Sequence, residues 1–231
     1  MIILAIDTAL DACAAAVLDT EAGVLLACES QAMARGHAEA LMPLIDRVMS
    51  ASGRTYLTLD RIGVTIGPGS FTGLRVGISA ARGLALAADK PVVGLTTLSA
   101  FAAPYVTQDA SQPIVSAIDA RHDHVYFQVV AGDGEMLAGP RVARVSETVE
   151  AARFGAPRLV GNAAAILAAR WPADAPPPVL IDAQPAPEIA WVAWLGAAAT
   201  PDKARARPFY LRAPDARPQI MPIQTAPVPA P

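Results

Sequence analysis

The stretch Ile2-Ile3-Leu4-Ala5-Ile6-Asp7 is a short apolar run that ends in a carboxylate. Two more apolar runs follow it, at residues 12–18 and 24–29, and the turn-like residues 19–23 separate them. Runs of this length bounded by turn residues are typical of strands. We therefore expect three consecutive antiparallel strands at the start of the chain.

The same pattern returns later in the sequence. At an offset of 112 residues, Ala5-Ile6-Asp7 aligns with Ala117-Ile118-Asp119, and the following runs and turns align without a gap. Self-similarity at a fixed offset indicates duplicated structural units. The sequence thus predicts two α/β halves that begin alike, each with a strand that ends in Asp.

Helical periodicity marks several segments between the expected strands. Apolar residues recur at helical spacing over residues 36–51, which predicts one helix or two short ones, because Pro43 could kink it. Residues 74–88 have helical composition and stop at Asp89-Lys90-Pro91. Further strands are expected at 62–66, 92–95 and 158–160, and further helices at 146–154, 162–170 and 187–198.

Two β-rich halves that each open with a strand ending in Asp resemble the actin-like ATPase superfamily, with its sugar kinases and heat-shock ATPases. The resemblance implies a cleft in which the two turns face each other and cradle phosphates, with Asp7 and Asp119 as corresponding carboxylates. We expect a first half at 1–105, a second half at 106–213, and a proline-rich, disordered tail at 214–231.

Composition restricts the classes of partner. A formal charge of -3 and a pI near 5.6 argue against a protein that holds a phosphate backbone by itself. The hydrophobic content of 53% and mean hydropathy of +0.37 suggest a partner face that becomes buried. The start of the chain lacks the features of a secretory signal, and no apolar run is long enough to span a bilayer, which predicts a cytoplasmic protein with no membrane contact.

The stretch Gly67-Pro68-Gly69-Ser70-Phe71-Thr72-Gly73 is a glycine-rich turn between an expected strand and an expected helix. Exposed backbone N–H groups and the helix dipole favour an anion at such a turn. The lysine of a Walker A loop is missing, and the spacing of a dinucleotide fingerprint is missing too. A plain tight turn, with Ser70 or Thr72 as N-cap, is the alternative.

The eleven residues from Gly67 to Gly77 resemble the signature of the TsaB (YeaZ) family and, more loosely, that of its paralogue TsaD. Four further segments are similar to TsaB proteins: residues 6–8, 36–43, 119–121 and 209–212. The resemblance covers residues 1–213 and is most specific in the first half.

This resemblance implies a non-catalytic subunit that binds and activates the TsaD threonylcarbamoyltransferase, which modifies tRNA next to the anticodon to N6-threonylcarbamoyladenosine. It implies that the chain itself needs no cofactor, that the complex uses ATP, and that the ATPase TsaE and tRNA associate through the complex. A homodimer of the isolated chain is also conceivable on this basis.

The resemblance also implies that the helices over residues 36–50 and 74–88 form the surface against TsaD. The partner-binding residues expected there are His37, Leu41, Leu44, Val48, Gly73, Arg75, Gly77 and Ala81. Gly73, Gly77 and Ala81, with the alanines at 85 and 88, form a strip of small side chains. This strip could admit another helix or could pack on the chain's own sheet. Arg75 lies near the positive end of its helix, so we expect an acidic partner or a bound anion beside it.

The residues give little support to a metalloenzyme or a protease. His37 stands alone on its helix, and His122 and His124 have no evident third ligand, so no metal site is expected. Ser70 does not lie in a nucleophile elbow, which disfavours a protease. We expect no catalytic residue in this chain.

Nucleotide chemistry is the main competing hypothesis. A vestigial nucleotide or anion site is expected to comprise Asp7, Thr8, Gly67, Gly69, Ser70 and Asp119. However, the turn after Asp119 contains no glycine, and residues 159–164 keep one glycine where a pair is needed. An autonomous ATPase or kinase of the actin-like superfamily is therefore the alternative function.

Overall fold

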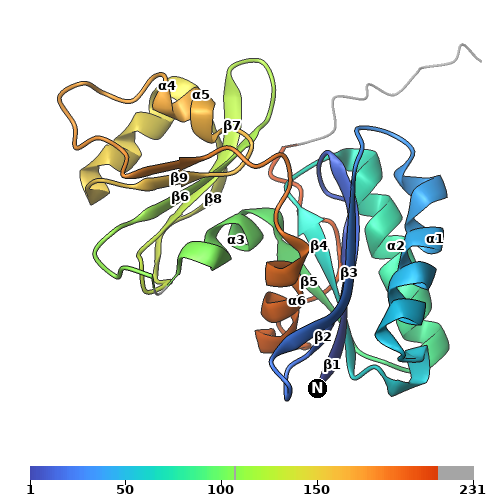
Figure 1. Cartoon of the computed structure of the whole chain (residues 1–231). Coiled ribbons are helices and arrows are strands. Elements are labelled where there is room, and N and C mark those ends of the chain that lie inside the picture. Colours follow the sequence, from blue (N-terminus) through green and yellow to red (C-terminus); the bar gives the residue numbers. More distant parts are fainter. Residues whose placement is uncertain (107, 213–231) are drawn as a thin grey trace, which may run out of the picture.

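The computed structural model describes residues 1–106 and 108–212, and Figure 1 shows them as two sheets with their helices. The predicted tail at 214–231 lies outside the described residues. The first sheet has the order β3-β2-β1-β4-β5. Its strands are β1 (Ile2–Asp7), β2 (Ala12–Asp19), β3 (Val24–Ala32), β4 (Arg61–Gly67) and β5 (Val92–Thr96). Strands β1, β2 and β3 pair antiparallel, whereas β4 and β5 continue the sheet in parallel.

The second sheet repeats this arrangement. Its order is β10-β9-β6-β7-β8, with β6, β7 and β8 antiparallel and β9 and β10 parallel. The strands are β6 (Ile114–Asp119), β7 (His124–Val130), β8 (Met136–Arg144), β9 (Arg158–Val160) and β10 (Leu180–Asp182). Each strand of one sheet thus has a counterpart in the other at the same place, which confirms the duplication and the actin-like α/β fold.

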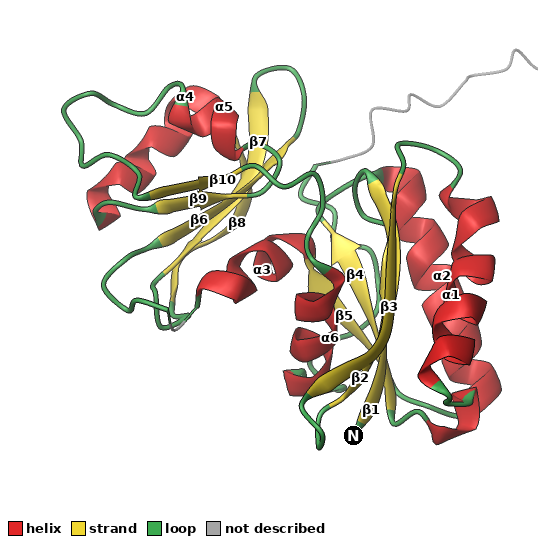
Figure 2. Ribbon diagram, in the orientation of Figure 1, coloured by secondary structure: helices red, strands yellow, loops and turns green. Residues whose placement is uncertain are grey.

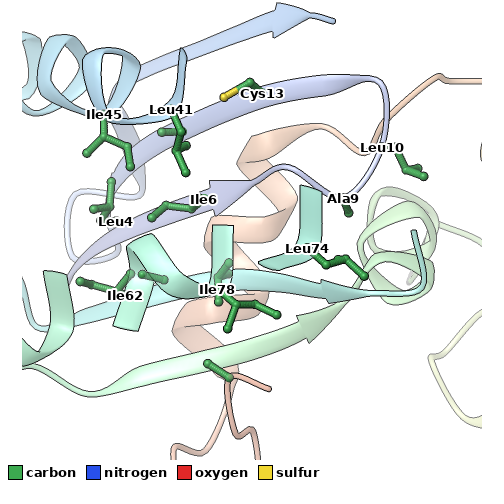
Figure 3. Packing of buried hydrophobic residues seen from close by; sticks show 14 of the residues in the cluster. Leu4, Ile6, Ala9, Leu10, Cys13, Leu41, Ile45, Ile62, Leu74 and Ile78 are labelled. Atoms are coloured by element: carbon green, nitrogen blue, oxygen red, sulfur yellow. The ribbon is translucent and has the colours of Figure 1, made fainter. Parts of the chain in front are cut away.

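Helices α1 (His37–Ser52) and α2 (Phe71–Ala88) cover one face of the first sheet, as Figure 2 shows. Alternate residues of β1 point to opposite faces: Leu4 and Ile6 join the core under these helices, whereas Ile3 and Ala5 pack with the helix on the other face. Figure 3 shows Leu41 and Ile45 of α1 and Ile78 of α2 directed into the first of these cores.

Helix α1 is continuous despite Pro43, which is exposed on its outer side. Left-handed glycines, Gly36 and Gly53, border both of its ends. Helix α2 begins after Ser70, whose hydroxyl accepts a hydrogen bond from Gly73 N at 3.2 Å as an N-cap. Of the two caps considered in the alternative of a plain turn, Ser70 and Thr72, the structure confirms Ser70, and the helix starts three residues before the predicted 74.

Smaller elements complete both halves. Helix α4 (Val145–Thr148) continues as the 3₁₀ helix η3 (Val149–Phe154), and α5 (Ala164–Ala168) is shorter than the predicted 162–170. The structure adds β10 and α3 (Thr97–Ala102), together with short 3₁₀ turns at Tyr56–Thr58 and Ala103–Tyr105. None of these additional segments has a clear period of its own in the sequence.

The chain returns to the first sheet before it ends. Helix α6 (Ile189–Ala198) packs on the face of the first sheet opposite α1 and α2, where Val192 and Ala193 are fully buried beside Ile3. Gly63 on β4 and Gly196 on α6 permit this close approach, and Arg61 Nη1 donates to three carbonyls at the end of the helix. The prediction that residues 106–213 form one half was therefore wrong for 189–212. The reason is that Val192, Ala193 and Gly196 of α6 pack on the face of the first sheet that α1 and α2 leave uncovered.

The strip of small residues on α2 faces the chain's own sheet. A Cβ added at Gly77 would lie 2.4 Å from Thr8 Oγ1, and one at Gly73 would lie 2.1 Å from Thr8 O. By contrast, a Cβ at Gly83, on the outer side of the same helix, would meet no atom within 4 Å. The glycines on the inner side therefore serve close packing, whereas Gly83 serves no contact within the described chain.

This difference predicts opposite effects of one substitution at two places on α2. Gly77→Ala should lower the free energy of unfolding by about 1–3 kcal/mol because of the clash with Thr8. Gly83→Ala should raise it by about 0.5–1 kcal/mol, since alanine loses less backbone entropy in a helix. Urea unfolding of both variants measures the effect. Destabilisation by Gly83→Ala, or none by Gly77→Ala, would contradict this description of the helix.

Candidate functional site

A cleft of about 620 Å³ lies between the two halves, at the carboxyl ends of the central strands. In actin-like proteins this is where the two turns would cradle phosphates. The cleft is lined by residues from the first turn (Leu10, Asp11), the glycine-rich turn (Pro68 to Phe71, with Leu74), the second half (Asp119 to Arg121, Tyr126, Asn162, Pro185) and the C-terminal segment Phe209–Arg212.

The glycine-rich turn lies directly on the first turn of the chain. A Cβ at Gly69 would lie 2.3 Å from Ala9 O, so only glycine fits there. Ser70 N donates to Ala9 O at 2.7 Å, and Thr8 Oγ1 donates to Gly73 O at 2.7 Å. The backbone N–H of Ser70, which an anion would use at such a turn, is thus already bonded within the chain.

Two residues predicted for a vestigial nucleotide site lie beneath this contact. Asp7 is 0% exposed and Thr8 is 1% exposed, and neither lines the cleft. Asp7 Oδ1 accepts hydrogen bonds from Thr65 Oγ1 and from Ala9 N, whereas Oδ2 has no partner within the described chain. The assignment of Asp7 and Thr8 to an anion site in this cleft was therefore wrong, because both side chains are buried and hydrogen-bonded within the first half.

Burial also changes the acidity of Asp7. Desolvation raises the pKa of this carboxyl above its ordinary value of 3.8, and the hydrogen bond from Thr65, the backbone hydrogen bonds and the nearby His37 counteract part of that effect. The ionised form of this carboxyl is therefore less stable than that of an exposed aspartate.

The other predicted members of this site have different positions. Gly67 is buried and lies behind the turn, where a Cβ would be 3.0 Å from Phe209 O. Gly69 and Ser70 line the cleft. Asp119 also lines it and is exposed. Its Oδ1 accepts a hydrogen bond from Arg121 N at 2.8 Å, and its own N–H donates to Asn162 Oδ1 at 2.9 Å.

The turn after Asp119 is crowded rather than open. Arg121, His122 and Asp123 all have left-handed backbone, with φ of 64°, 52° and 61°. Such values cost non-glycine residues about 1–2 kcal/mol each. No glycine occurs here to let a phosphate approach the backbone, and the side chain of Arg121 lines the cleft instead. The prediction that this turn differs from a phosphate-binding turn remains consistent with the geometry.

The C-terminal segment Phe209–Arg212 crosses the cleft and packs on the glycine-rich turn. Phe209 N donates to Ile66 O at 2.8 Å, and the ring of Tyr210 stacks on Phe71 with centroids 5.3 Å apart. Arg75 lies 3.6 Å above the Phe71 ring and donates from Nε to Tyr210 Oη at 3.2 Å. Within the described chain Arg75 thus contacts two aromatic rings, which sequence periodicity could not reveal, and the expected acidic partner or anion stays a prediction.

The predicted partner-binding residues lie mostly inside the molecule. Of the eight, only Arg75 is exposed. The other seven are buried in the core between the two helices and the sheet, so a partner cannot touch them directly: His37, Leu41, Leu44, Val48, Gly73, Gly77 and Ala81. The prediction was wrong because the apolar stripe of an amphipathic helix satisfies the chain's own core first.

The histidines form no metal site in the described part of the chain. His37 is 8% exposed, and its Nε2 lies 3.1 Å from Leu10 O. His124 Nδ1 lies 2.7 Å from His122 O. Among residues 1–106 and 108–212, no three His, Cys, Asp or Glu side chains come together in a way that could hold a metal ion. Absence of a metal from the protein in solution stays a prediction.

Duplicated five-stranded sheets around a central cleft define this chain as a member of the actin-like α/β class. The glycine-rich turn and the C-terminal residues Phe209 and Tyr210 form part of the lining of its cleft. A family model described as "TsaD: tRNA N6-adenosine threonylcarbamoyltransferase" matches residues 29–177. The solved structure of YeaZ from Pseudomonas aeruginosa superposes with a TM-score of 0.76 and 26% identity, covering 91% of this chain and 99% of that one.

Sequence relatives agree with this assignment. The Haemophilus influenzae protein named "tRNA threonylcarbamoyladenosine biosynthesis protein TsaB" is 37% identical over 128 residues, or 55% of this chain and 53% of that protein. The match thus spans about half the length of that curated relative. An uncharacterised protein of Mycobacterium tuberculosis is 34% identical over 94% of both chains. The chain belongs to the TsaB (YeaZ) family, which the TsaD-related family model also covers in part.

The environment of Asp7 predicts a specific pH dependence. A raised pKa in the folded state means that the carboxyl contributes stability below pH 3.8, and that this contribution is lost as pH rises through the folded pKa. The variant Asp7→Asn lacks this titration, so the free energy of unfolding of the two chains is compared. The stability of the unmodified chain relative to Asp7→Asn should fall as pH rises. The total fall should be about 1.4 kcal/mol for each pH unit by which folding raises the Asp7 pKa. Urea unfolding over a pH series measures it.

Thr65→Val provides the matched control for this prediction. It removes the hydrogen bond that lowers the Asp7 pKa, so it should make the loss of stability larger and extend it to higher pH. Parallel stability curves for the unmodified chain and Asp7→Asn across the whole pH series would show that the pKa is not raised.

Proposed function

We propose that this chain is a non-catalytic subunit that binds and activates a TsaD-like threonylcarbamoyltransferase. The complex would modify tRNA next to the anticodon to N6-threonylcarbamoyladenosine. Family membership supports the pathway, because the curated relatives are named for threonylcarbamoyladenosine biosynthesis. One observation supports the non-catalytic role. In the glycine-rich turn, the backbone N–H of Ser70 donates to Ala9 O, and Tyr210 stacks on Phe71. An active relative would hold phosphates at this turn.

The likeness to TsaD supports the choice of partner. Part of this chain is 36% identical to a tRNA N6-adenosine threonylcarbamoyltransferase from Erythrobacter litoralis, over 44% of this chain and 33% of that protein. Proteins that share a fold often pair through equivalent surfaces, as in pseudo-symmetric dimers. We propose that the partner surface is the outer side of α1 and α2, and that a second copy of this chain uses the same surface in isolation.

Exposed apolar groups support this surface. Leu86 on α2 is 86% exposed and Met42 on α1 is 45% exposed. The outer side of α2 also carries the small residues Ser79, Gly83 and Ala87, all exposed. Large apolar side chains beside small ones let another helix approach closely and bury the larger group. The inner strip at Gly73, Gly77 and Ala81 no longer has this role.

The remaining partners follow from the complex. A TsaE-like ATPase and tRNA would associate through the assembly, which would use the ATP, and this chain would need no cofactor of its own. Within the described residues, every helix falls short of the length and apolar character that a membrane span needs. We propose a cytoplasmic location, because the tRNA substrate is found there.

The partner surface can be tested with a charge on its most exposed apolar residue. Leu86→Asp should weaken the complex with TsaD about ten- to hundredfold, since burying a leucine contributes about 1.5–3 kcal/mol and 1.4 kcal/mol is a tenfold change. Titration calorimetry measures the affinity, and thermal melting should show an unchanged monomer. Ile181→Asp is the control, because Ile181 is 49% exposed but lies on the second half. Equal affinities of the two variants would place the interface elsewhere.

Ala81→Trp distinguishes the two sides of the same helix. Ala81 is 0% exposed, so the larger ring should unfold or strongly destabilise the isolated chain rather than weaken the complex selectively. Gly83→Trp, on the outer side, should leave the monomer folded and weaken the complex.

The non-catalytic role is tested by reconstitution. The purified chain alone should neither modify tRNA nor turn over ATP, and addition of TsaD, TsaE, ATP and the threonylcarbamoyl donor should restore modification. Asp119 is the exposed carboxylate of the cleft, so Asp119→Ala is the diagnostic variant for the alternative function. Steady ATP hydrolysis by the lone chain that Asp119→Ala abolishes would establish an autonomous nucleotide-dependent enzyme instead.

A further inference from the structure

Positive charge is concentrated in one short segment of this acidic chain. Residues 203–212 read Lys-Ala-Arg-Ala-Arg-Pro-Phe-Tyr-Leu-Arg, with four cationic side chains and no acidic one. The chain as a whole carries a formal charge of -3. A local excess of this kind attracts anionic partners even when the net charge of the protein is negative.

The structure places three of these cations around one groove. The groove has a volume of about 480 Å³ and lies beside β5, on the other side of Phe209 from the cleft. Lys203, Arg205 and Arg207 line it and are exposed, and Asp202 is the one acidic residue of its lining. None of the ion pairs within the described residues involves Lys203, Arg205 or Arg207.

The backbone under these side chains is fixed. Gly94 N donates to Ala204 O at 2.8 Å, and Arg205 forms a bridge with Val93 of β5. A Cβ at Gly94 would lie 2.7 Å from Arg205 O, so the segment lies close against the strand. Buried Ala206 joins the core, and Arg207 N donates to Arg205 O at 2.9 Å across it. This tight turn keeps both arginines on the outer side.

Anchored arginines without carboxylate partners favour phosphate groups. The guanidinium fork binds phosphate oxygens with two parallel hydrogen bonds, and a fixed backbone lowers the entropy lost on binding. We propose that the groove lined by Lys203, Arg205 and Arg207 binds phosphodiester groups of RNA. Because the RNA is the tRNA of the complex, this inference rests on the proposed function, to which it adds an RNA-contacting surface on this subunit.

The small number of cations in this groove agrees with a subunit that assists RNA binding and does not bind RNA tightly by itself. Three contacts give a small part of the affinity of a nucleic-acid-binding protein, which usually neutralises more phosphates. The catalytic subunit would supply the remaining contacts, and this chain would fix the orientation of the RNA.

The test compares tRNA binding by the complex at several salt concentrations. In the triple variant Lys203→Gln, Arg205→Gln and Arg207→Gln, the slope of log affinity against log salt should fall by about 2, and affinity at low salt about tenfold or more. The control is Arg141→Gln, Arg153→Gln and Arg170→Gln, which removes the same charge from second-half arginines that already contact Glu150, Phe154 and Asp123. It should leave the slope nearly unchanged.

Other outcomes separate the alternatives. Equal slopes for the groove variant and the unmodified complex would overturn the inference. So would loss of affinity for TsaD with unchanged tRNA binding, because the groove would then contact protein. Competition by inorganic phosphate alone, with no effect of the triple variant on tRNA, would show an anion site that RNA does not use. If no complex with TsaD forms, the proposed function fails, and tRNA binding by the isolated chain at low salt still tests the groove.

Discussion

The contact between two backbone turns controls the rest of this structure. The carbonyl oxygens of Thr8 and Ala9 occupy positions where any side chain at residues 73 and 69 would lie, 2.1 and 2.3 Å away. Glycine at both positions lets the turn after β4 close over the turn after β1. This closure fixes the start of α2, which brings Leu74 and Ile78 into the core, and it leaves Asp7 sealed beneath with a raised pKa.

The same closure explains how an actin-like fold is used without an evident phosphate site. The backbone N–H of Ser70 in the glycine-rich turn is paired with Ala9 O, and Phe71 and Arg75 contact Tyr210. The C-terminal segment thereby connects the cleft, the edge of β5 and the basic groove. The partner surfaces that we propose lie outside the cleft, on α1 and α2 and beside β5.

The two halves show how far a sequence repeat can be taken. Asp7 and Asp119 are equivalent in sequence and in strand position, yet one is sealed and the other exposed. In the first half an 18-residue helix follows the glycine-rich turn, and the carboxylate is buried beside Thr65 and Ala9. In the second half the helix has 5 residues, and the left-handed turn at 121–123 projects outward. The repeat predicted the strands well, but it could not predict what covers them.

The sequence by itself determined the three opening strands of each half, the duplication, the amphipathic pattern of residues 36–51 and the glycine-rich turn at 67–73. These features depend on local periodicity and backbone freedom, which neighbouring residues encode. Only the tertiary structure decided that Leu41, Gly77 and Ala81 face the chain's own sheet, that α6 returns to the first half, and that Tyr210 covers the turn. Periodicity defines an apolar face but not the surface that covers it, and contacts between residues more than a hundred positions apart leave no local pattern.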